Sequence, residues 1–324
     1  MTLKALVRCG VAALMACAAA CAAAQAPAYP NKAVRVFVGY AAGGPVDNAF
    51  RRIAPAFSKE LGQSVVVENR AGAGGVLAAD AVAKAEPDGY TLIFQGSPTV
   101  TMTPHMMKSV PFDPIRDFTP ISMAVGFATV LVVNKDLPVR DVQQLIAYAR
   151  ANPGKVSYGS AGIGASNHLS GELLAKRANL QMIHAPYKGN ALALTDVISG
   201  QLSFMFNSIG DSIGFIQKGQ VRPLAVSSKA RSRALPDVPT MIETGVPDFD
   251  VTAWYALQGP PRLPRPIVNR LNTAIRGALA DPTVARQFND IGYDVMPSTP
   301  EELAAIVQAD YERWSPVARS IKID

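Results

Sequence analysis

The stretch VSYGSAGIGASNH at residues 156–168 predicts a strand, a glycine turn and the start of a helix. Residues 156–158 suit the end of a strand, and apolar residues at helical spacing begin at Leu169, behind the N-cap types Ser166 and Asn167. The glycines of the turn are Gly159, Gly162 and Gly164. Because glycine has no Cβ, backbone N–H groups can approach a bound group closely, and a helix N-terminus favours an anion. The alternative is a tight turn with glycine for steric reasons only.

Further loops of the same kind occur nearer the N-terminus. A buried-strand pattern at residues 34–38 continues into GYAAGGPVD, in which Asp47 occupies the expected N-cap position. A second strand at 64–68 is followed by NRAGAGG, and a strand at 90–95 ends in GSPT. Strands that alternate with helices over short connections predict an α/β sheet, whose ligands bind beyond the carboxyl ends of the strands. We therefore expect all these loops to open on one rim.

Two segments are interpreted as crossings between domains. The apolar run at residues 121–134 indicates a strand that leaves one domain and enters another, after which the strand–helix alternation restarts. Residues 251–258, with Trp254, are interpreted as the return crossing, and four prolines stiffen the segment that follows. Two α/β domains joined by two crossings are the plan of exported solute receptors, in which closure buries the ligand.

Residues 1–24 have the pattern of a secretory signal. Lys4 and Arg8 precede an alanine-rich apolar core, and AAA stands before Gln25. The apolar run is shorter than the roughly 20 residues that a membrane span needs. The cysteines are Cys9, Cys17 and Cys21, all inside this segment. The processed chain would therefore have no thiol and no disulfide. A lipoprotein acylated at Cys17 is the alternative.

Composition excludes several function classes. Removing residues 1–24, with Lys4 and Arg8, leaves 300 of 324 residues and changes the net charge from +6 to +4. This length allows two domains, and the scattered basic residues are not interleaved with aromatics as a nucleic-acid surface would be. The histidines are His105, His168 and His184. They lack an H-x-x-x-H spacing, so we expect no metal site and no cofactor.

Six stretches together resemble a known family. They are AGGPVD at 42–47, LGQSVVVENRAGAGG at 61–75, PDGYTL at 87–92, YGSAGIGASNHLSGELL at 158–174, HAPYKG at 184–189 and LPDVPTMIETG at 235–245. The chain resembles the periplasmic solute receptors of tripartite tricarboxylate transporters, often called Bug proteins. The resemblance implies a monomeric α/β protein of the two-lobed, Venus-flytrap type (type II-like), without enzymatic activity. One lobe would comprise residues 25–127 plus 251–324, and the other 128–250.

The resemblance also implies a ligand and partners. A small carboxylate would be held between the lobes, largely through backbone N–H groups, hydroxyls and water, and delivered to integral membrane subunits of the transporter. By position, the expected binding residues are Tyr40, Ala42, Gly43, Gly44, Asp47, Ser97, Thr99, Ser160, Ala161, Gly162, Gly164, Ser166, Asn167, His168 and Asn207.

Asn207 departs from the family pattern, because relatives often have Asp at this position. A neutral amide at the cleft rim would not pair with a ligand ammonium group as a carboxylate would. From this residue we predict a di- or tricarboxylate or an aromatic acid ahead of an amino acid. A second departure is GYAA at residues 39–42, which replaces a commoner Pro-Phe-x-Pro-Gly start.

The competing interpretation is a serine hydrolase of small esters that uses Ser160 with His168 and Asp47. However, GSAG at residues 159–162 is not the G-x-S-x-G nucleophile elbow, and His168 suits a cap or a cleft wall equally well. The sequence therefore favours a receptor.

The signal interpretation predicts that the processed protein begins at Gln25, because cleavage after Ala24 satisfies the small-residue rule. N-terminal sequencing of protein exported by its host measures this directly. A start at an acylated Cys17 would instead make the protein lipid-anchored and contradict the prediction.

Overall fold

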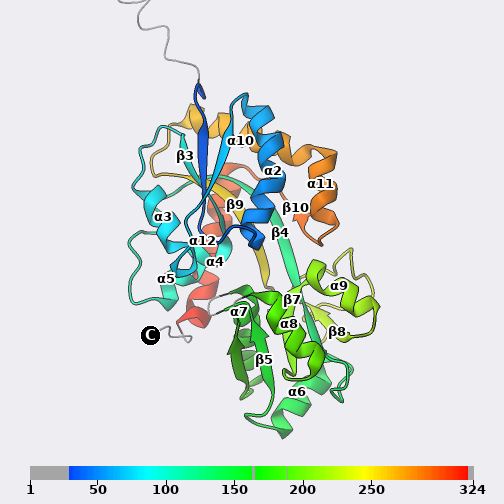
Figure 1. Ribbon diagram of the computed structural model, residues 1–324. Helices are drawn as coiled ribbons and strands as arrows, with labels where there is room; N and C mark the ends of the chain where they lie inside the picture. Colours follow the sequence, from blue (N-terminus) through cyan, green and yellow to red (C-terminus); the bar gives the residue numbers. More distant parts are fainter. Residues whose placement is uncertain (1–28, 163–164, 188, 320–324) are drawn as a thin grey trace, which may run out of the picture.

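The computed structural model describes residues 29–162, 165–187 and 189–319. Within these residues the chain forms two α/β lobes, one above the other in Figure 1, with the segment 1–24 outside the described part. The predicted α/β class and the two-lobed arrangement are confirmed.

Lobe 1 contains the first sheet, ordered β2-β1-β3-β9-β4, with β1 parallel to β2 and β3. Its strands are β1 (Val34–Val38), β2 (Val65–Asn69), β3 (Thr91–Gly96), β9 (Thr252–Gly259) and β10 (Asp294–Val295), with the first part of β4 (Thr119–Asn134). Its helices are α2 (Pro45–Leu61), η1 (Ala73–Gly75), α3 (Val76–Ala83), α4 (Ser97–Thr101), α5 (Thr103–Met106), α10 (Arg265–Ala280), α11 (Pro282–Asn289) and α12 (Pro300–Ala318).

Lobe 2 contains the second sheet, in which β7 and β8 pair with the rest of β4, and β5 lies between β7 and β6. Its strands are β5 (Ser157–Ser160), β6 (Ile183–Pro186), β7 (Phe204–Ser208) and β8 (Val221–Val226). Its helices are α6 (Val142–Ala151), α7 (Ser166–Ala178), α8 (Asn190–Ser199) and α9 (Ile209–Gln217).

The strand β4 belongs to both sheets. It pairs with β9 as far as Ala128, which lies opposite Thr252, and it pairs with β7 from Thr129, which lies opposite Ser208. The change of partner occurs within one peptide unit. This supports the predicted division of the chain after residues 127 and 250, which we propose as the lobe boundaries.

Helix α2 illustrates how the sequence sets the elements of lobe 1. Pro45 is its first residue, where the missing N–H costs nothing, and Gly62 ends it in the left-handed conformation with φ of 69°. Phe50, Ile53 and Phe57 recur at helical spacing and are fully buried in the core of the lobe. Burying each such side chain stabilises the fold by roughly 1.5–3 kcal/mol.

The C-terminal helix α12 connects the lobes a third time. Its N-terminus in lobe 1 has the capping box of Thr299 and Glu302. Its last turns run down to lobe 2 (Figure 1), where Trp314 joins the core that contains Leu173 of α7. The Lys176 ammonium also donates to the Pro316 carbonyl over 3.2 Å.

Some local predictions need correction. The segment after Gly96, expected as a loop, forms the short helix α4, and a second short helix, α5, follows. Residues around Glu243 form a turn, in which the Glu243 carboxylate accepts from the Thr240 N–H over 2.7 Å. Short elements have few periodic positions, so sequence pattern defines them poorly.

The lobes also touch where α9 begins. A Cβ on Gly210 of lobe 2 would lie 2.4 Å from the carbonyl oxygen of Ile291 in lobe 1. Beside it, a Cβ on Gly292 would lie 3.2 Å from the Cβ of Ile209. Glycine at these positions therefore allows backbone from one lobe to approach backbone from the other.

This contact predicts opposite effects for two equivalent substitutions in α9. Gly214→Ala should raise the free energy of unfolding by about 0.5–1 kcal/mol, because a Cβ on Gly214 meets nothing within 4 Å. Gly210→Ala should lower it and change the angle between the lobes, because the methyl group overlaps the Ile291 carbonyl. Urea unfolding and small-angle X-ray scattering measure the two effects. Equal stabilisation by both substitutions would show that the contact is not maintained in solution.

Candidate functional site

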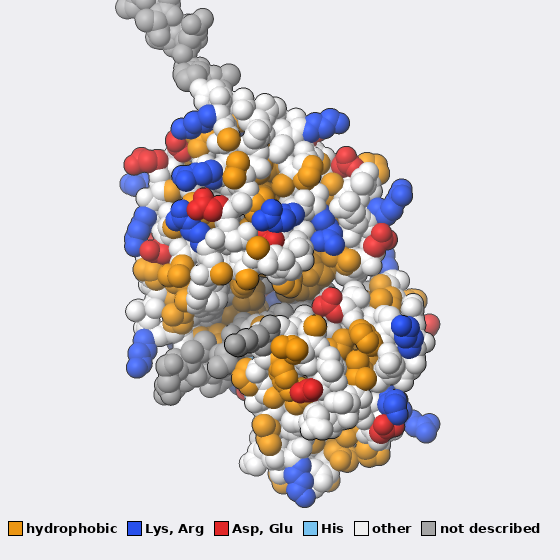
Figure 2. Space-filling view, viewed as in Figure 1, with side chains coloured by type: hydrophobic (Ala, Val, Ile, Leu, Met, Phe, Trp, Pro, Cys, Tyr) orange, Lys and Arg blue, Asp and Glu red, His pale blue; other side chains and the backbone are white. Residues whose placement is uncertain are grey.

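A cleft of about 530 Å³ lies between the lobes, and Figure 2 shows the molecule hollowed there. It forms where the carboxyl ends of the parallel strands of both lobes meet. Its wall comprises Tyr40, Gly43, Pro45, Val46, Asn48, Arg52, Gly96, Pro98, Phe127, Thr129, Ala161, Ala165, Ser166, Asn167, Gly189, Asn190, Ser208, Asp211, Ala253, Tyr255, Ile291 and Tyr293. A smaller cavity of about 240 Å³ lies beside residues 126–128 and contains none of the glycine loops.

Helix N-termini converge on this cleft from both lobes. The first residues of α2 in lobe 1, and of α7, α8 and α9 in lobe 2, line its wall. Their N-cap residues are Gly44, Ala165, Gly189 and Ser208, none of which makes a side-chain capping hydrogen bond. The side-chain caps of the described helices occur at Asp141, Asp281 and Thr299, away from the cleft. Helix N–H groups with a partial positive charge are therefore available at the cleft.

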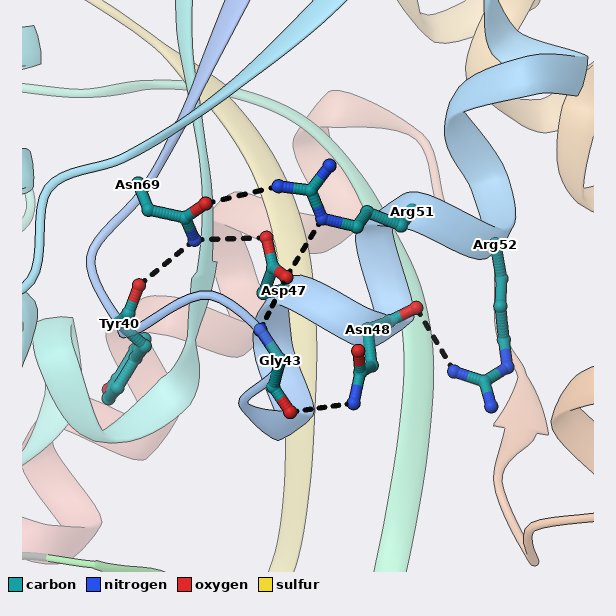
Figure 3. Close-up of polar contacts among 7 residues, drawn as sticks. All are labelled: Tyr40, Gly43, Asp47, Asn48, Arg51, Arg52 and Asn69. Carbon is teal, nitrogen blue, oxygen red and sulfur yellow. Dashed lines mark hydrogen bonds and ion pairs between the residues drawn. The ribbon is translucent and has the colours of Figure 1, made fainter.

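The first loop is shaped by Asp47 (Figure 3). Its carboxylate accepts from the Gly43 N–H over 2.8 Å, from Arg51 Nε over 2.8 Å and from Asn69 Nδ2 over 2.9 Å. Burial alone would raise the pKa of Asp47, but the hydrogen bonds from Arg51, Gly43 and Asn69 hold it below its usual value. The N-cap is Gly44, so the prediction that Asp47 occupies the cap position is wrong. With a buried side chain, Asp47 orders the loop from behind.

The hydroxyls predicted at the end of β3 also lie behind the wall. The Thr99 hydroxyl donates to the Gly74 carbonyl over 3.0 Å and is hydrogen-bonded to the Tyr40 hydroxyl over 2.9 Å. Ser97 is buried as well, and its Oγ accepts from the Trp254 N–H over 3.4 Å. Of this group, Tyr40 reaches the cleft.

The second loop is fixed by side-chain to backbone hydrogen bonds. Ser160 Oγ lies 2.7 Å from His184 Nε2, and it also bonds the N–H and the carbonyl of Gly162 over 3.2 and 3.1 Å. Asn167 Oδ1 accepts from the Ala161 N–H over 3.2 Å. The N-cap of α7 is Ala165, so the expected N-cap role of Ser166 and Asn167 is wrong. Both residues instead lie in the first turn of α7 and line the cleft wall.

Beneath this loop His168 and His184 stack with their ring centroids 3.8 Å apart. Tyr158 stacks on His184 at 5.0 Å, and its hydroxyl donates to Glu172. The pKa of each histidine is lowered from 6.5 to about 4, chiefly by burial; for His184 the neighbouring His168 contributes to the decrease and Glu172 opposes it. The pair is therefore neutral at pH 7 and forms a flat, uncharged base for the loop.

This geometry does not support the hydrolase alternative. The histidine that bonds Ser160 is His184 rather than His168, and Asp47 belongs to the other lobe, where it bonds Arg51. Ser160 is also 0% exposed, so its hydroxyl cannot reach a substrate carbonyl.

The structure divides the predicted site residues into groups. Those on the cleft wall are Tyr40, Gly43, Ala161, Ser166 and Asn167. Those in the two loops but not on the wall are Ala42, Gly44 and Gly162. Those buried behind it are Asp47, Ser97, Thr99, Ser160, His168 and Asn207. Gly164 lies outside the described residues. The loops are thus brought together, and ligand contact by these residues stays a prediction.

Asn207 does not reach the cleft wall. It lies inside β7 rather than after it, it is 0% exposed, and its Nδ2 donates to Ser212 Oγ over 2.9 Å. Successive residues of a strand point to opposite faces, and the neighbouring Ser208 lies on the cleft wall instead of Asn207. The preference for a di- or tricarboxylate or an aromatic acid over an amino acid was inferred from Asn207 at the cleft rim, and its position inside β7 does not support that inference.

Several wall residues were not anticipated. Arg52 lies two turns into α2, and Asp211 lies in the first turn of α9. Tyr255, on the return strand, and Tyr293, before β10, come from distant parts of the sequence. Asp211 could have been found as the acid just inside a helix that follows a strand. Among the described residues, no three His, Asp or Glu side chains cluster closely enough to hold a metal ion.

The fold, together with a cleft lined by helix N-termini, defines a two-lobed binding protein of the periplasmic type. Residues 49–323 match the tripartite tricarboxylate transporter family receptor model, and the chain belongs to that family.

Individual relatives agree with this assignment. The chain is 34% identical to the protein BugT of Bordetella pertussis over 306 residues, which are 94% of each chain. A Rhodopseudomonas palustris protein solved with adipate is 33% identical, with a TM-score of 0.80 and coverage of 90% of this chain and 98% of that one. MatC from the same organism, solved with malate, is 32% identical, with a TM-score of 0.78 and coverage of 90% and 100%.

The stacked histidines predict a pH-dependent stability. Between pH 6.5 and about 4 the unfolded chain binds more protons than the folded one, because the folded pKa values are the lower ones. The contribution of this pair to the free energy of unfolding should therefore fall as the pH decreases through this range and level off below it. Urea unfolding at several pH values measures the slope.

Two variants serve as controls, each measured at the same pH values. The double variant His168→Gln/His184→Gln should lose most of the dependence of the free energy of unfolding on pH. The single variant His105→Gln should keep most of it. Equal slopes for wild type and the double variant would contradict the assignment to the pair.

Proposed function

We propose that the protein captures a small carboxylate in the interlobe cleft and delivers it to the integral membrane subunits of a tripartite tricarboxylate transporter. The observation that carries this proposal is the convergence of uncapped helix N-termini from both lobes on one cleft. Such N-termini bind anions through their N–H groups and their dipoles. Helices α7 and α8 have no acidic residue in their first turns to offset this charge.

The relatives support a carboxylate ligand. Adipate and malate, bound by the two Rhodopseudomonas palustris proteins, are both carboxylates. The family consists of solute-binding receptors, which are not enzymes. Closure of two lobes over an anion would place it between N–H groups on both sides and remove it from water, which strengthens each charged hydrogen bond.

The proposed location is the periplasm. The relatives of this chain are periplasmic receptors. None of the helices in the described residues is both long and apolar enough to cross a membrane. Export through the segment 1–24, and action as a monomer, stay predictions, because that segment lies outside the described residues and a single chain is described.

The proposal predicts that Ser166→Asp changes stability and binding in opposite directions. An acid in the first turn of α7 should raise the free energy of unfolding by about 0.3–1 kcal/mol through the helix dipole. The same carboxylate, on the cleft wall, should weaken carboxylate binding at least ten-fold by repulsion. Calorimetry with monocarboxylates (hexanoate and 6-hydroxyhexanoate) and dicarboxylates (succinate, adipate and malate), and urea unfolding, measure the two effects.

The matched control is Thr283→Asp, in the first turn of α11 and away from the cleft, which should leave binding unchanged. If Ser166→Asp binds carboxylates as tightly as wild type, the anion does not lie at the start of α7. If wild type binds no carboxylate, the proposed function is wrong.

A further inference from the structure

Two charged side chains face the cleft, one from each lobe. Arg52 of α2 and Asp211 of α9 are the charged residues among its described wall residues. A di- or tricarboxylate site is expected to present cations and N–H groups throughout, because each carboxylate needs a compensating partner. An acid on the wall therefore carries information about the ligand.

Asp211 is available to a ligand. Its side chain is exposed, and its described contact is a long hydrogen bond of 3.4 Å from Asn190 Nδ2 to its Oδ2. No salt bridge involves Asp211 within the described part of the chain. Because it lies in the first turn of α9, its negative charge also offsets the positive end of that helix. This end of the cleft is therefore the least favourable for an anion.

Arg52 lies on the lobe 1 side of the cleft, and Asp211 lies on the lobe 2 side. The Arg52 guanidinium donates to the Asn48 carbonyl over 3.1 Å, as Figure 3 shows, and has no acidic partner among the described residues. The two charges act on a common neighbour, Tyr293. Burial raises the pKa of Tyr293 to about 12, with smaller effects from Tyr255, which lowers it, from Asp211, which raises it, and from Arg52, which lowers it.

The wall near these charges is aromatic. Phe127 stacks on Tyr293 with centroids 4.3 Å apart and meets Tyr255 edge-on at 5.0 Å. All three line the cleft, and their rings offer flat apolar surface to the body of a ligand.

We infer that the ligand has a single carboxylate, an apolar or aromatic body, and at its other end a hydrogen-bond donor, an ammonium or a hydroxyl, that faces Asp211. This inference rests on the proposed function, because it assumes that the carboxylate lies at the starts of α2 and α7, rather than at the starts of α8 and α9, where Asn190 and Asp211 contact each other. Asp211 accepts from the donor, whereas a second carboxylate at that end meets like charge. Asp211 thus selects against dicarboxylates of the same length.

The test is a panel of ligands that differ only at the far end. The six-carbon set is adipate, 6-hydroxyhexanoate, 6-aminohexanoate and hexanoate. The four-carbon set is succinate, 4-hydroxybutyrate, 4-aminobutyrate and butyrate, and the aromatic set is benzene-1,4-dicarboxylate, 4-(hydroxymethyl)benzoate, 4-(aminomethyl)benzoate and 4-methylbenzoate. Dissociation constants are measured by calorimetry for wild type, for Asp211→Asn and for the control Asp136→Asn. Asp136 is an exposed acid of lobe 2 that pairs with Lys135 away from the cleft.

In wild type, the tightest donor-ended acid should bind at least ten-fold more tightly than the dicarboxylate of its set. Asp211→Asn should reduce this ratio to about three-fold or less, chiefly by improving dicarboxylate binding, and Asp136→Asn should leave it unchanged. Tighter binding of the dicarboxylate by wild type, or a ratio that Asp211→Asn leaves unchanged, would overturn the inference but not the proposed function. The second result would mean that Asp211 only stabilises the start of α9. If no acid of the panel binds, the proposed function fails and the inference fails with it.

Discussion

The continuity of β4 through both sheets is the constraint on which the rest of the structure depends. Its backbone hydrogen-bonds to β9 up to Ala128 and to β7 from Thr129, so the two sheets meet within one peptide unit. The carboxyl ends of β3 and β7 therefore lie near this junction, from opposite sides. Helices that follow parallel strands start at those ends, and so their N-termini face each other across the cleft. The anion-attracting character of the cleft thus follows from strand pairing before any particular side chain is considered.

The sequence allowed the loops to be predicted better than the side chains that form the wall. Glycine turns after apolar strands identified both loops that border the cleft, because that pattern is local. Asn207 was expected at the cleft rim but is buried within β7, while its neighbour Ser208 lies on the cleft wall, because successive strand residues point to opposite faces. Tyr255 and Tyr293 could not be predicted as wall residues, since they reach the cleft only through the return crossing and through β10, a two-residue strand without a sequence pattern. Contacts between distant segments leave no periodic signal in a single sequence.

Several of the polar side chains that were predicted to bind the ligand hydrogen-bond to the backbone of the two loops. Asp47 uses both carboxylate oxygens within lobe 1, and Ser160 bonds both backbone groups of Gly162. Buried polar groups need partners, and here the partners are the backbone groups of the loops. In this chain, serine, threonine and aspartate side chains beside the glycine loops therefore hold the loops in place. This supporting role also explains why Ser160 lies 2.7 Å from His184 although its side chain is buried and not exposed as a nucleophile.

The absence of side-chain caps on the four helices at the cleft has a thermodynamic consequence. A missing cap costs about 1 kcal/mol where the N-cap residue is Ala, as in α7, and only a few tenths of that where it is Gly, as in α2 and α8. The described helices away from the cleft include three with side-chain caps. Large apolar cores in both lobes offset this cost in the unliganded protein. When an anion binds, it supplies the missing hydrogen-bond acceptors, so the stabilisation that caps would have provided becomes part of the binding free energy. A permanent carboxylate cap at the start of α7 would make the protein more stable and the cleft less attractive to anions. The same N–H groups cannot serve both purposes.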